Sequence, residues 1–317
     1  MDQQTGTTRD DVGRTPAADV PSIPASGIPV RSMSEADLKT ALQWAATEGW
    51  NPAHGDVGPM LEADPEGFVM GHLDGEPVAS VSAVRYGEDY GFIGMYICVP
   101  QHRGQGHGLS VFNRAMARLE GRVIGLDAVT QQRQNYEKRG FVVAHQTVRF
   151  QGVMDAGNIS ADRPCSALAI DGLAIQELSE DSVRLVLDFD RKYFPAPRER
   201  LMRAWLTAPT HTARVVLDEN GVVLGYGVLR PCHEGARVGP LFATSAFIAE
   251  MLFRSLAAEV APQTKLTLDV PDANVTGMRM AERLGLNTGW HGFRMYRGTP
   301  PSLPLDHIFG ITSLEIG

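Results

Sequence analysis

A strand, a glycine-rich turn and the start of a helix follow one another in residues 93–119. The apolar, β-branched run that begins at Ile93 ends at Pro100, and glycines follow at positions 104, 106 and 108. From Leu109 onward, apolar residues recur at helical spacing. The first N–H groups of a helix lack partners within it and its dipole favours an anion, so glycine there lets a phosphate approach bare backbone. This stretch therefore predicts a site for a phosphate-bearing ligand.

Composition limits the class of protein. The 317 residues are 43% hydrophobic and 21% charged, which is typical of a soluble chain with two ordinary domains. No apolar run approaches the roughly 18 residues of a membrane span, and no signal segment opens the chain, so we expect a cytoplasmic protein without a membrane partner. The net charge of −8 argues against nucleic acid, and it either favours a cationic partner or only maintains solubility. Cys98, Cys165 and Cys232 lie far apart, which argues against disulfides and against a metal site.

The elements expected in the first half alternate strands with helices. Residues 1–27 are polar and aperiodic and predict a disordered tail. Ser34 is a predicted N-cap for the first helix. The other predictions are strands over 28–31, 68–73, 78–84, 93–100, 123–126, 141–144 and 146–150, and helices over 109–119 and 127–139.

The second half repeats the first. Met33 to Leu38 matches Leu178 to Val183 at an offset of 145 (178 minus 33), and Gly94 matches Gly239 at the same offset. The segment from Tyr136 to Phe141 matches 281–286, again 145 residues on. Several matches at one offset indicate a duplicated domain, which could replace a dimer, so we expect a monomer or a homodimer. The predicted units are a domain over 28–150, a linker over 151–173 and a second domain over 174–317, with a last strand within 307–316.

Two motifs give the first half a family resemblance. Arg103-Gly-Gln-Gly106-His-Gly108 fits the Q/R-x-x-G-x-G/A signature of the GNAT superfamily of N-acetyltransferases, and Tyr136-Glu-Lys-Arg-Gly-Phe141 is similar to its Y-x-K-x-G-F motif. The second half resembles the same fold without the first motif. The resemblance implies an α/β fold with a mixed sheet in each of two tandem GNAT domains.

The resemblance also implies acetyl-coenzyme A as co-substrate and no metal. In that family, the glycine-loop N–H groups hold the coenzyme pyrophosphate, the preceding strand pairs with the pantetheine, and the amine attacks the thioester directly through a tetrahedral intermediate. The residues implied for coenzyme binding are Tyr96, Ile97, Cys98, Arg103, Gly104, Gln105, Gly106, His107 and Gly108.

Tyr136 matches the tyrosine that protonates the departing thiolate in that family; the alternative is a helix-end tyrosine that packs against Phe141. The asparagine that usually precedes this tyrosine by seven residues is replaced by Val129, whereas the second half has Asn274 there but Ala281 in place of the tyrosine. At the glycine positions of the loop, the second half has Ala249, Met251 and Phe253. We therefore expect a degenerate second copy and one coenzyme per chain.

The predictions of the general base and of the acceptor site rest on fewer sequence features. Asp127 is a candidate base, but Asp272 occupies the same repeat position, which favours a helix N-cap for both. Glu88 is a second candidate, and a solvated turn is its alternative. Trp50, His54 and Asp56 lie in a loop that borders the acceptor site in GNAT proteins; they are candidate acceptor contacts through charge and cation–π interaction, or simply polar loop residues.

The function predicted from the resemblance is transfer of acetyl from acetyl-coenzyme A to a primary amine of a small molecule or peptide. Two alternatives stay open: a non-catalytic acyl-coenzyme A sensor, and a transferase with a longer acyl donor. The residues do not identify the amine.

Overall fold

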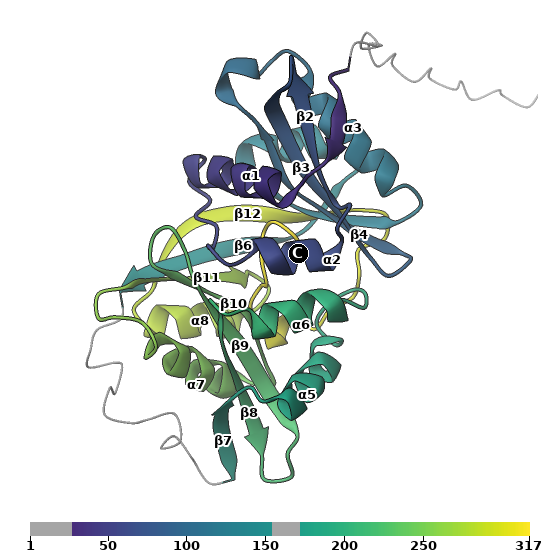
Figure 1. Cartoon of the computed structure of the whole chain (residues 1–317). Coiled ribbons are helices and arrows are strands. Elements are labelled where there is room, and N and C mark those ends of the chain that lie inside the picture. The colour runs from purple at the N-terminus through teal and green to yellow at the C-terminus, as the bar shows by residue number, and fades with distance from the viewer. Residues whose placement is uncertain (1–26, 154–171) are drawn as a thin grey trace, which may run out of the picture.

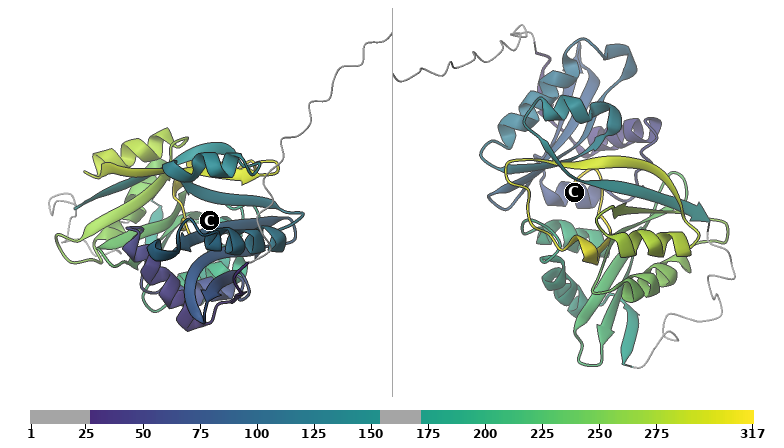
Figure 2. Two further views of the ribbon diagram at one scale, coloured as in Figure 1. Left: turned by 90° about the horizontal axis from the view of Figure 1, so that it is seen from above. Right: turned by 180° about the vertical axis from the view of Figure 1, so that it is seen from behind.

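The computed structural model describes residues 27–153 and 172–317. The tail predicted over 1–27 and the linker predicted over 151–173 lie largely outside the described residues. Two similar halves share one sheet, and the last residues of the chain lie between them (Figures 1 and 2).

The first half follows the predicted order of elements in outline, with an additional helix, α2 (Val57–Ala63), that the sequence did not predict. Ser34 caps the first helix, because its Oγ accepts the Asp37 N–H at 3.2 Å while the Asp37 carboxylate accepts the Ser34 N–H at 2.9 Å. The elements are β1 (Val30–Ser32), α1 (Glu35–Thr47), α2 (Val57–Ala63), β2 (Phe68–Leu73), β3 (Glu76–Tyr86), β4 (Tyr90–Cys98), α3 (His107–Arg118), β5 (Val123–Val129), α4 (Arg133–Glu137) and β6 (Val142–Val153).

The second half repeats this order. Ser179 caps the helix that corresponds to α1, by accepting the Ser182 N–H. The elements are β7 (Leu173–Glu177), α5 (Glu180–Asp190), α6 (Glu199–Thr207), β8 (Thr212–Asp218), β9 (Val223–Pro231), β10 (Ala236–Ala243), α7 (Ala246–Ala257), β11 (Lys265–Pro271), α8 (Val275–Arg283), β12 (Asn287–Arg297) and β13 (Ile308–Gly310).

The halves exchange their last long strands. The described strands form one sheet in the order β1-β2-β3-β4-β5-β12-β6-β11-β10-β9-β8-β7, with β13 beside β10. Strand β12 of the second half thus pairs with β5, and β6 of the first half pairs with β11. Figure 2 shows β12, in yellow, alongside β6, in teal. Each half completes its sheet with a strand from the other, and the boundary predicted at residue 150 falls inside β6.

Two local predictions were wrong. The strands expected over 141–144 and 146–150 are one strand, β6, which bends through register shifts against β12. The helix expected over 127–139 is mostly not helical, because β5 continues to Val129 in register with β12 and only a 3₁₀ turn and the short α4 follow. Pairing with a strand more than 150 residues away overrides the local helical pattern.

Three apolar clusters hold the fold together. One lies between α3 and the first half of the sheet, and a second lies under α7 in the other half. The third belongs to both halves, because Leu38 of α1, Trp205 of α6 and Ile316 of the chain's end are all buried in it. Helices α2 and α6 also pack against each other across this boundary. The shared cluster fixes how the two halves meet around the site.

Candidate active site

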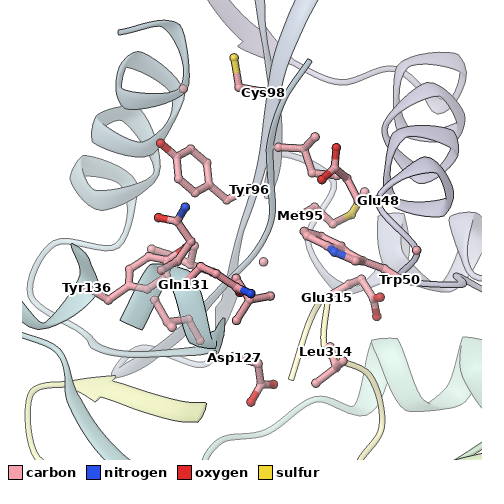
Figure 3. Close-up of a pocket in the computed structure, with 18 of the residues that line it drawn as sticks. Glu48, Trp50, Met95, Tyr96, Cys98, Asp127, Gln131, Tyr136, Leu314 and Glu315 are labelled. Atoms are coloured by element: carbon pink, nitrogen blue, oxygen red, sulfur yellow. The ribbon is translucent and has the colours of Figure 1, made fainter. Parts of the chain in front are cut away.

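A cavity of about 790 Å³ opens where β4 separates from β5, and both halves of the chain line it. Figure 3 shows Tyr96 and Tyr136 on one side, Trp50 and Met95 on the other, and Glu315 beside Trp50. The lining residues are Glu48, Gly49, Trp50, Ile93, Gly94, Met95, Tyr96, Ile97, Cys98, Arg103, Gly104, Gly106, Gly108, Leu109, Leu126, Asp127, Val129, Gln131, Gln132, Tyr136, Arg149, Trp290, Leu314 and Glu315.

The separation of β4 from β5 begins after Ile93. The two parallel strands pair from Tyr90 to Ile93, and beyond that point no described strand pairs with this side of β4. A bulge accompanies the separation, since the register against β3 shifts there and Met95 adopts a φ of 46°. The backbone of the last residues of β4 is therefore open to a ligand that pairs with it as a strand would.

The glycine loop forms the phosphate-binding geometry that the sequence predicts. Gly104 and Gly106 have φ values of +75° and +86°, and a Cβ on either would meet no atom within 4 Å. Gly106 is the N-cap of α3, where no side chain caps the helix and no acidic residue lies in the first turn. The loop therefore leaves free space in front of backbone N–H groups at the positive end of a helix dipole, a geometry that fits a pyrophosphate.

The residues predicted to bind coenzyme line this cavity, except for Gln105 and His107. Arg103 does not extend freely into solvent, because its Nε donates to the Cys98 carbonyl at 2.8 Å and its guanidinium pairs with Glu48. The Glu48 carboxylate is thereby occupied by a cation at the glycine-loop end of the cavity.

Tyr136 both lines the cavity and packs against Phe141. Its ring lies 5.8 Å from that of Phe141 and 5.9 Å from that of Phe112, and only 9% of the residue is exposed. In the described part of the chain its hydroxyl makes no hydrogen bond, so it is available to a ligand. Burial raises the pKa of Tyr136, and Tyr96 raises it by a smaller amount. The hydroxyl is therefore protonated at neutral pH.

Asp127 is buried in an ion pair and is not a helix N-cap. Its side chain is 1% exposed, and both carboxylate oxygens accept hydrogen bonds from Arg294 of β12, at 2.9 and 2.8 Å. Burial raises the pKa of Asp127, and Arg294 opposes that rise. With both oxygens occupied by a guanidinium, the carboxylate is not free to take a proton from a ligand. The structure thus contradicts the N-cap interpretation, since Gln132 is the N-cap of α4, and the ion pair argues against Asp127 as the base.

The same ion pair recurs in the second half. Asp269 of β11 pairs with Arg149 of β6, at 2.7 and 2.9 Å, in a register equivalent to that of Asp127 and Arg294. The counterpart of Asp127 is therefore Asp269, not Asp272 as the repeat offset indicated, because the helix that follows the strand is longer in the second half: α8 has nine residues and α4 has five.

The other predicted base and two of the acceptor residues lie away from the cavity. Glu88 is exposed in the turn before β4, at the opposite end of that strand from the separation. His54 is exposed and packs against His233, with ring centroids 4.6 Å apart. Asp56 is buried with Arg230 and His211, which hold its pKa below the usual range although burial acts to raise it. Only Trp50 of the three acceptor candidates lines the cavity.

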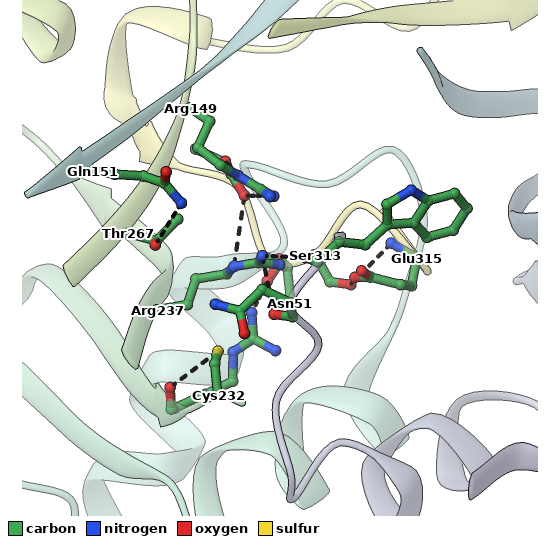
Figure 4. A network of polar contacts seen from close by, with 12 residues as sticks. Asn51, Arg149, Gln151, Cys232, Arg237, Thr267, Ser313 and Glu315 are labelled. Atoms are coloured by element: carbon green, nitrogen blue, oxygen red, sulfur yellow. Dashed lines mark hydrogen bonds and ion pairs between the residues drawn. The ribbon is translucent and has the colours of Figure 1, made fainter. Parts of the chain in front are cut away.

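The second half supplies part of the cavity lining, which sequence reasoning missed. Trp290, Leu314 and Glu315 line the cavity, and Figure 3 shows Leu314 and Glu315 at the end away from Cys98. Arg237 of β10 donates to the carbonyls of Trp50, at 2.9 Å, and Asn51, at 3.2 Å, and so fixes the loop that carries Trp50 (Figure 4). The sequence predicted one strand within 307–316, but β13 ends at Gly310 and the chain then runs toward the first half.

In the second half, the chain's own strand β13 occupies the place that corresponds to the opening beside β4. It pairs with β10 at Leu241 and Phe242, the repeat counterparts of Tyr96 and Ile97. Asn274, at the position of the family's coenzyme-contacting asparagine, donates its Nδ2 to the Ile308 carbonyl of β13 at 3.0 Å. The groups that would otherwise face a coenzyme are thus occupied by protein.

Comparison with known proteins agrees with this geometry. A family model described as the acetyltransferase (GNAT) family matches residues 36–141, and one described as an acetyltransferase (GNAT) domain matches residues 186–310. A holothin acyltransferase from Pseudoalteromonas sp. (strain SANK 73390) is 34% identical over 275 residues, which cover 87% of this chain and 90% of the relative. The chain belongs to the GNAT family, in a tandem arrangement, and is an acyltransferase.

Solved structures share the fold of this tandem GNAT protein. A candidate acetyltransferase from Pyrococcus horikoshii superposes with a TM-score of 0.72 at 21% identity, over 94% of this chain and 99% of that one. A tandem GNAT protein from the clavulanic acid biosynthesis pathway superposes with a TM-score of 0.58 at 12% identity, over 87% and 99%. No helix among the described residues is long and apolar enough to cross a membrane, and no described cluster of His, Cys, Asp and Glu side chains suits a metal ion.

Proposed function

We propose that this GNAT protein transfers an acetyl group from acetyl-coenzyme A to a primary amine. The observation that carries the proposal is that a single cavity joins three features: the open edge of β4 beyond Ile93, the uncapped N-terminus of α3 at Gly106, and the unbonded hydroxyl of Tyr136. The first two fit the pantetheine and the pyrophosphate of a coenzyme, and the third supplies a proton donor.

Tyr136 is the general acid in this proposal. A protonated phenol beside the departing sulfur can donate its proton as the C–S bond breaks, and burial keeps the hydroxyl protonated until then. Backbone N–H groups of β4 near Tyr96 polarise the thioester carbonyl, because the separation from β5 leaves them without a partner in the sheet.

One coenzyme binds per chain in this proposal. Strand β13 fills the corresponding opening beside β10, and Ser245 is the N-cap of α7, because its Oγ accepts the Ile248 N–H at 3.3 Å. The second half instead completes the acceptor end of the cavity through Trp290 and Glu315.

The acceptor is an amine-bearing small molecule. The relative from Pseudoalteromonas is named for acyl transfer to holothin, and the alignment spans most of both chains, so holothin belongs in the first set of acceptors to be tested.

Calorimetric titration tests the coenzyme site with a matched pair of variants. The variants are Gly106→Ala and Gly221→Ala, at residues with φ values of +86° and +78°. In each, the new Cβ would meet no atom within 4 Å, so both variants have a similar cost in backbone strain, about 1–2 kcal/mol. We expect one coenzyme A site per chain, weakened at least about 10-fold in Gly106→Ala only. Equal effects of the two variants, or no binding to the wild type, contradict the proposed site.

Turnover is measured with acetyl-, propionyl- and octanoyl-coenzyme A as donors and with holothin, benzylamine, spermidine and glucosamine as acceptors. The expected result is acetyl transfer to at least one amine. Binding of coenzyme without transfer to any acceptor supports the sensor alternative, and faster turnover with octanoyl-coenzyme A supports the longer donor.

A further inference from the structure

The chain after β13 is fixed against the opening of the first half. Ser82 donates its hydroxyl to the Glu315 carbonyl at 2.8 Å, and Tyr86 donates to the Ile316 carbonyl at 2.8 Å. Gly94 lies so close to this segment that a Cβ would be 2.1 Å from the Glu315 carbonyl oxygen. Glu315 therefore sits directly against the β4 bulge, where the separation from β5 begins.

The Glu315 carboxylate has one oxygen without a partner. The residue is 2% exposed and lines the cavity. Its Oε2 accepts a hydrogen bond from the Ser313 hydroxyl, whereas Oε1 is buried and has no hydrogen-bond partner among the described residues. A buried acceptor that lacks a donor is costly, by about 1–3 kcal/mol or more for a charged group, so this oxygen is expected to receive a donor from a ligand.

Other charged groups near Glu315 are occupied by different partners. The Arg237 guanidinium donates to the carbonyls of Trp50 and Asn51, and its Nε lies 3.8 Å from Asp269. Burial acts to lower the pKa of Arg237, but Asp269 and then Glu315 outweigh this effect, so the pKa is raised. None of the described hydrogen bonds or ion pairs joins Arg237 to Glu315. Figure 4 shows Glu315 linked to Ser313 and separate from the arginine network.

The other carboxylates that line the cavity are already neutralised by cations. Asp127 is paired with Arg294, and Glu48 is paired with Arg103 at the glycine-loop end. In the residues that the structure describes, Glu315 is thus the cavity-lining carboxylate with no ion pair. It lies at the acceptor end, beside Trp50 and Leu314 and opposite Cys98 (Figure 3).

We propose that Glu315, supplied by the second half of the chain, binds the ammonium group of the acceptor and takes a proton from it, with the acceptor's body held against Trp50 and Trp290. These indole rings favour an amine carried on an aromatic or otherwise apolar body. The proposal rests on the proposed function for its chemical step, and the binding part of it does not require turnover.

The proton and electron balance assigns one role to each side chain. Glu315 Oε1 takes one proton from the ammonium, which frees the nitrogen lone pair to form the C–N bond as the C–S bond of the thioester breaks. Tyr136 gives its proton to the leaving sulfur and regains one, through solvent, from the nitrogen that becomes the amide. Glu315 then releases its proton to solvent, so each turnover releases one proton overall.

The test compares Glu315→Gln with Glu88→Gln, an exposed glutamate of the turn before β4. Benzylamine is titrated into each protein saturated with coenzyme A, and turnover is measured separately with the fastest acceptor of the panel. We expect Glu315→Gln to weaken benzylamine binding at least about 10-fold and to lower kcat/KM for the amine about 10²-fold or more, with coenzyme A affinity unchanged. Glu88→Gln should match the wild type.

The outcomes separate this inference from the proposed function. Wild-type amine binding and turnover in Glu315→Gln overturn the role of Glu315 and leave the proposed function intact. Amine binding that depends on Glu315 without acetyl transfer by the wild type supports the ammonium site and contradicts the transferase. If Glu315→Gln does not fold, the affinity of the wild-type protein for benzyl alcohol is compared with its affinity for benzylamine. We expect benzyl alcohol to bind at least 10-fold more weakly, and equal affinities overturn the inference.

Discussion

Gly94→Ala provides a direct test of whether the end of the chain must lie where it does. The new Cβ would be 2.1 Å from the Glu315 carbonyl oxygen and 2.9 Å from its Cα, both of which are backbone atoms that cannot rotate away. An ordinary contact between the new Cβ and the carbonyl oxygen is 3.4 Å, so the two atoms must move apart by about 1.3 Å (3.4 minus 2.1). The same carbonyl accepts the Ser82 hydroxyl at 2.8 Å, so the shift also strains that bond.

A misplacement of about 1 Å in a catalytic site can cost about 10²-fold in rate. We therefore expect Gly94→Ala to lower kcat/KM for the amine about 10²-fold and to destabilise the fold by about 1–3 kcal/mol through overpacking. Steady-state kinetics and urea unfolding measure the two effects. Gly58→Ala in α2 is the matched control, because its Cβ would meet nothing within 4 Å. Wild-type amine kinetics in Gly94→Ala would refute the reasoning.

Three further predictions concern titratable side chains that are buried or partly buried. Tyr136→Phe should lower kcat about 10²-fold and leave coenzyme A affinity unchanged in calorimetry; an unchanged kcat argues against the general acid. Asp127→Ala leaves Arg294 buried without its partner, so urea unfolding should show a loss of about 3–5 kcal/mol, and a loss below 1 kcal/mol contradicts the ion pair. Burial, and then Arg294, lowers the pKa of His145 from 6.5 to about 3, so the unfolded chain binds a proton that the native protein does not. The free energy of unfolding should therefore fall as the pH drops from 6.5 toward 3, and less steeply in His145→Gln; identical slopes would contradict burial of the neutral ring.

The parts of the site that local sequence determines could be predicted. The glycine loop depends on backbone conformations that glycine alone adopts easily, and Gly104 and Gly106 have the positive φ values that this requires. The helix cap at Ser34 and the hairpin of β2 and β3 likewise depend on neighbours a few residues away.

The parts of the site that depend on long-range pairing could not be predicted from the sequence. Asp127 stands before an apparently helical segment, and only the insertion of β12 beside β5 makes it the partner of Arg294. Glu315 lies 221 residues from Gly94 (315 minus 94), and no periodicity or motif in the sequence predicts that contact. A search of the first half alone for a base therefore could not have found Glu315, the base that we propose.

The exchange of strands has a consequence for the order of events during synthesis. Once residues 27–153 have emerged from the ribosome, the glycine loop, Tyr136 and β6 are outside it. Strand β5 still lacks the neighbour that pairs with it in the finished sheet. That neighbour, β12, ends at Arg297, so nearly the whole chain must emerge before the first sheet can close. We expect ribosome-bound chains stopped at residue 153 not to retain coenzyme A, and the ability to bind it to arise late, together with the second half.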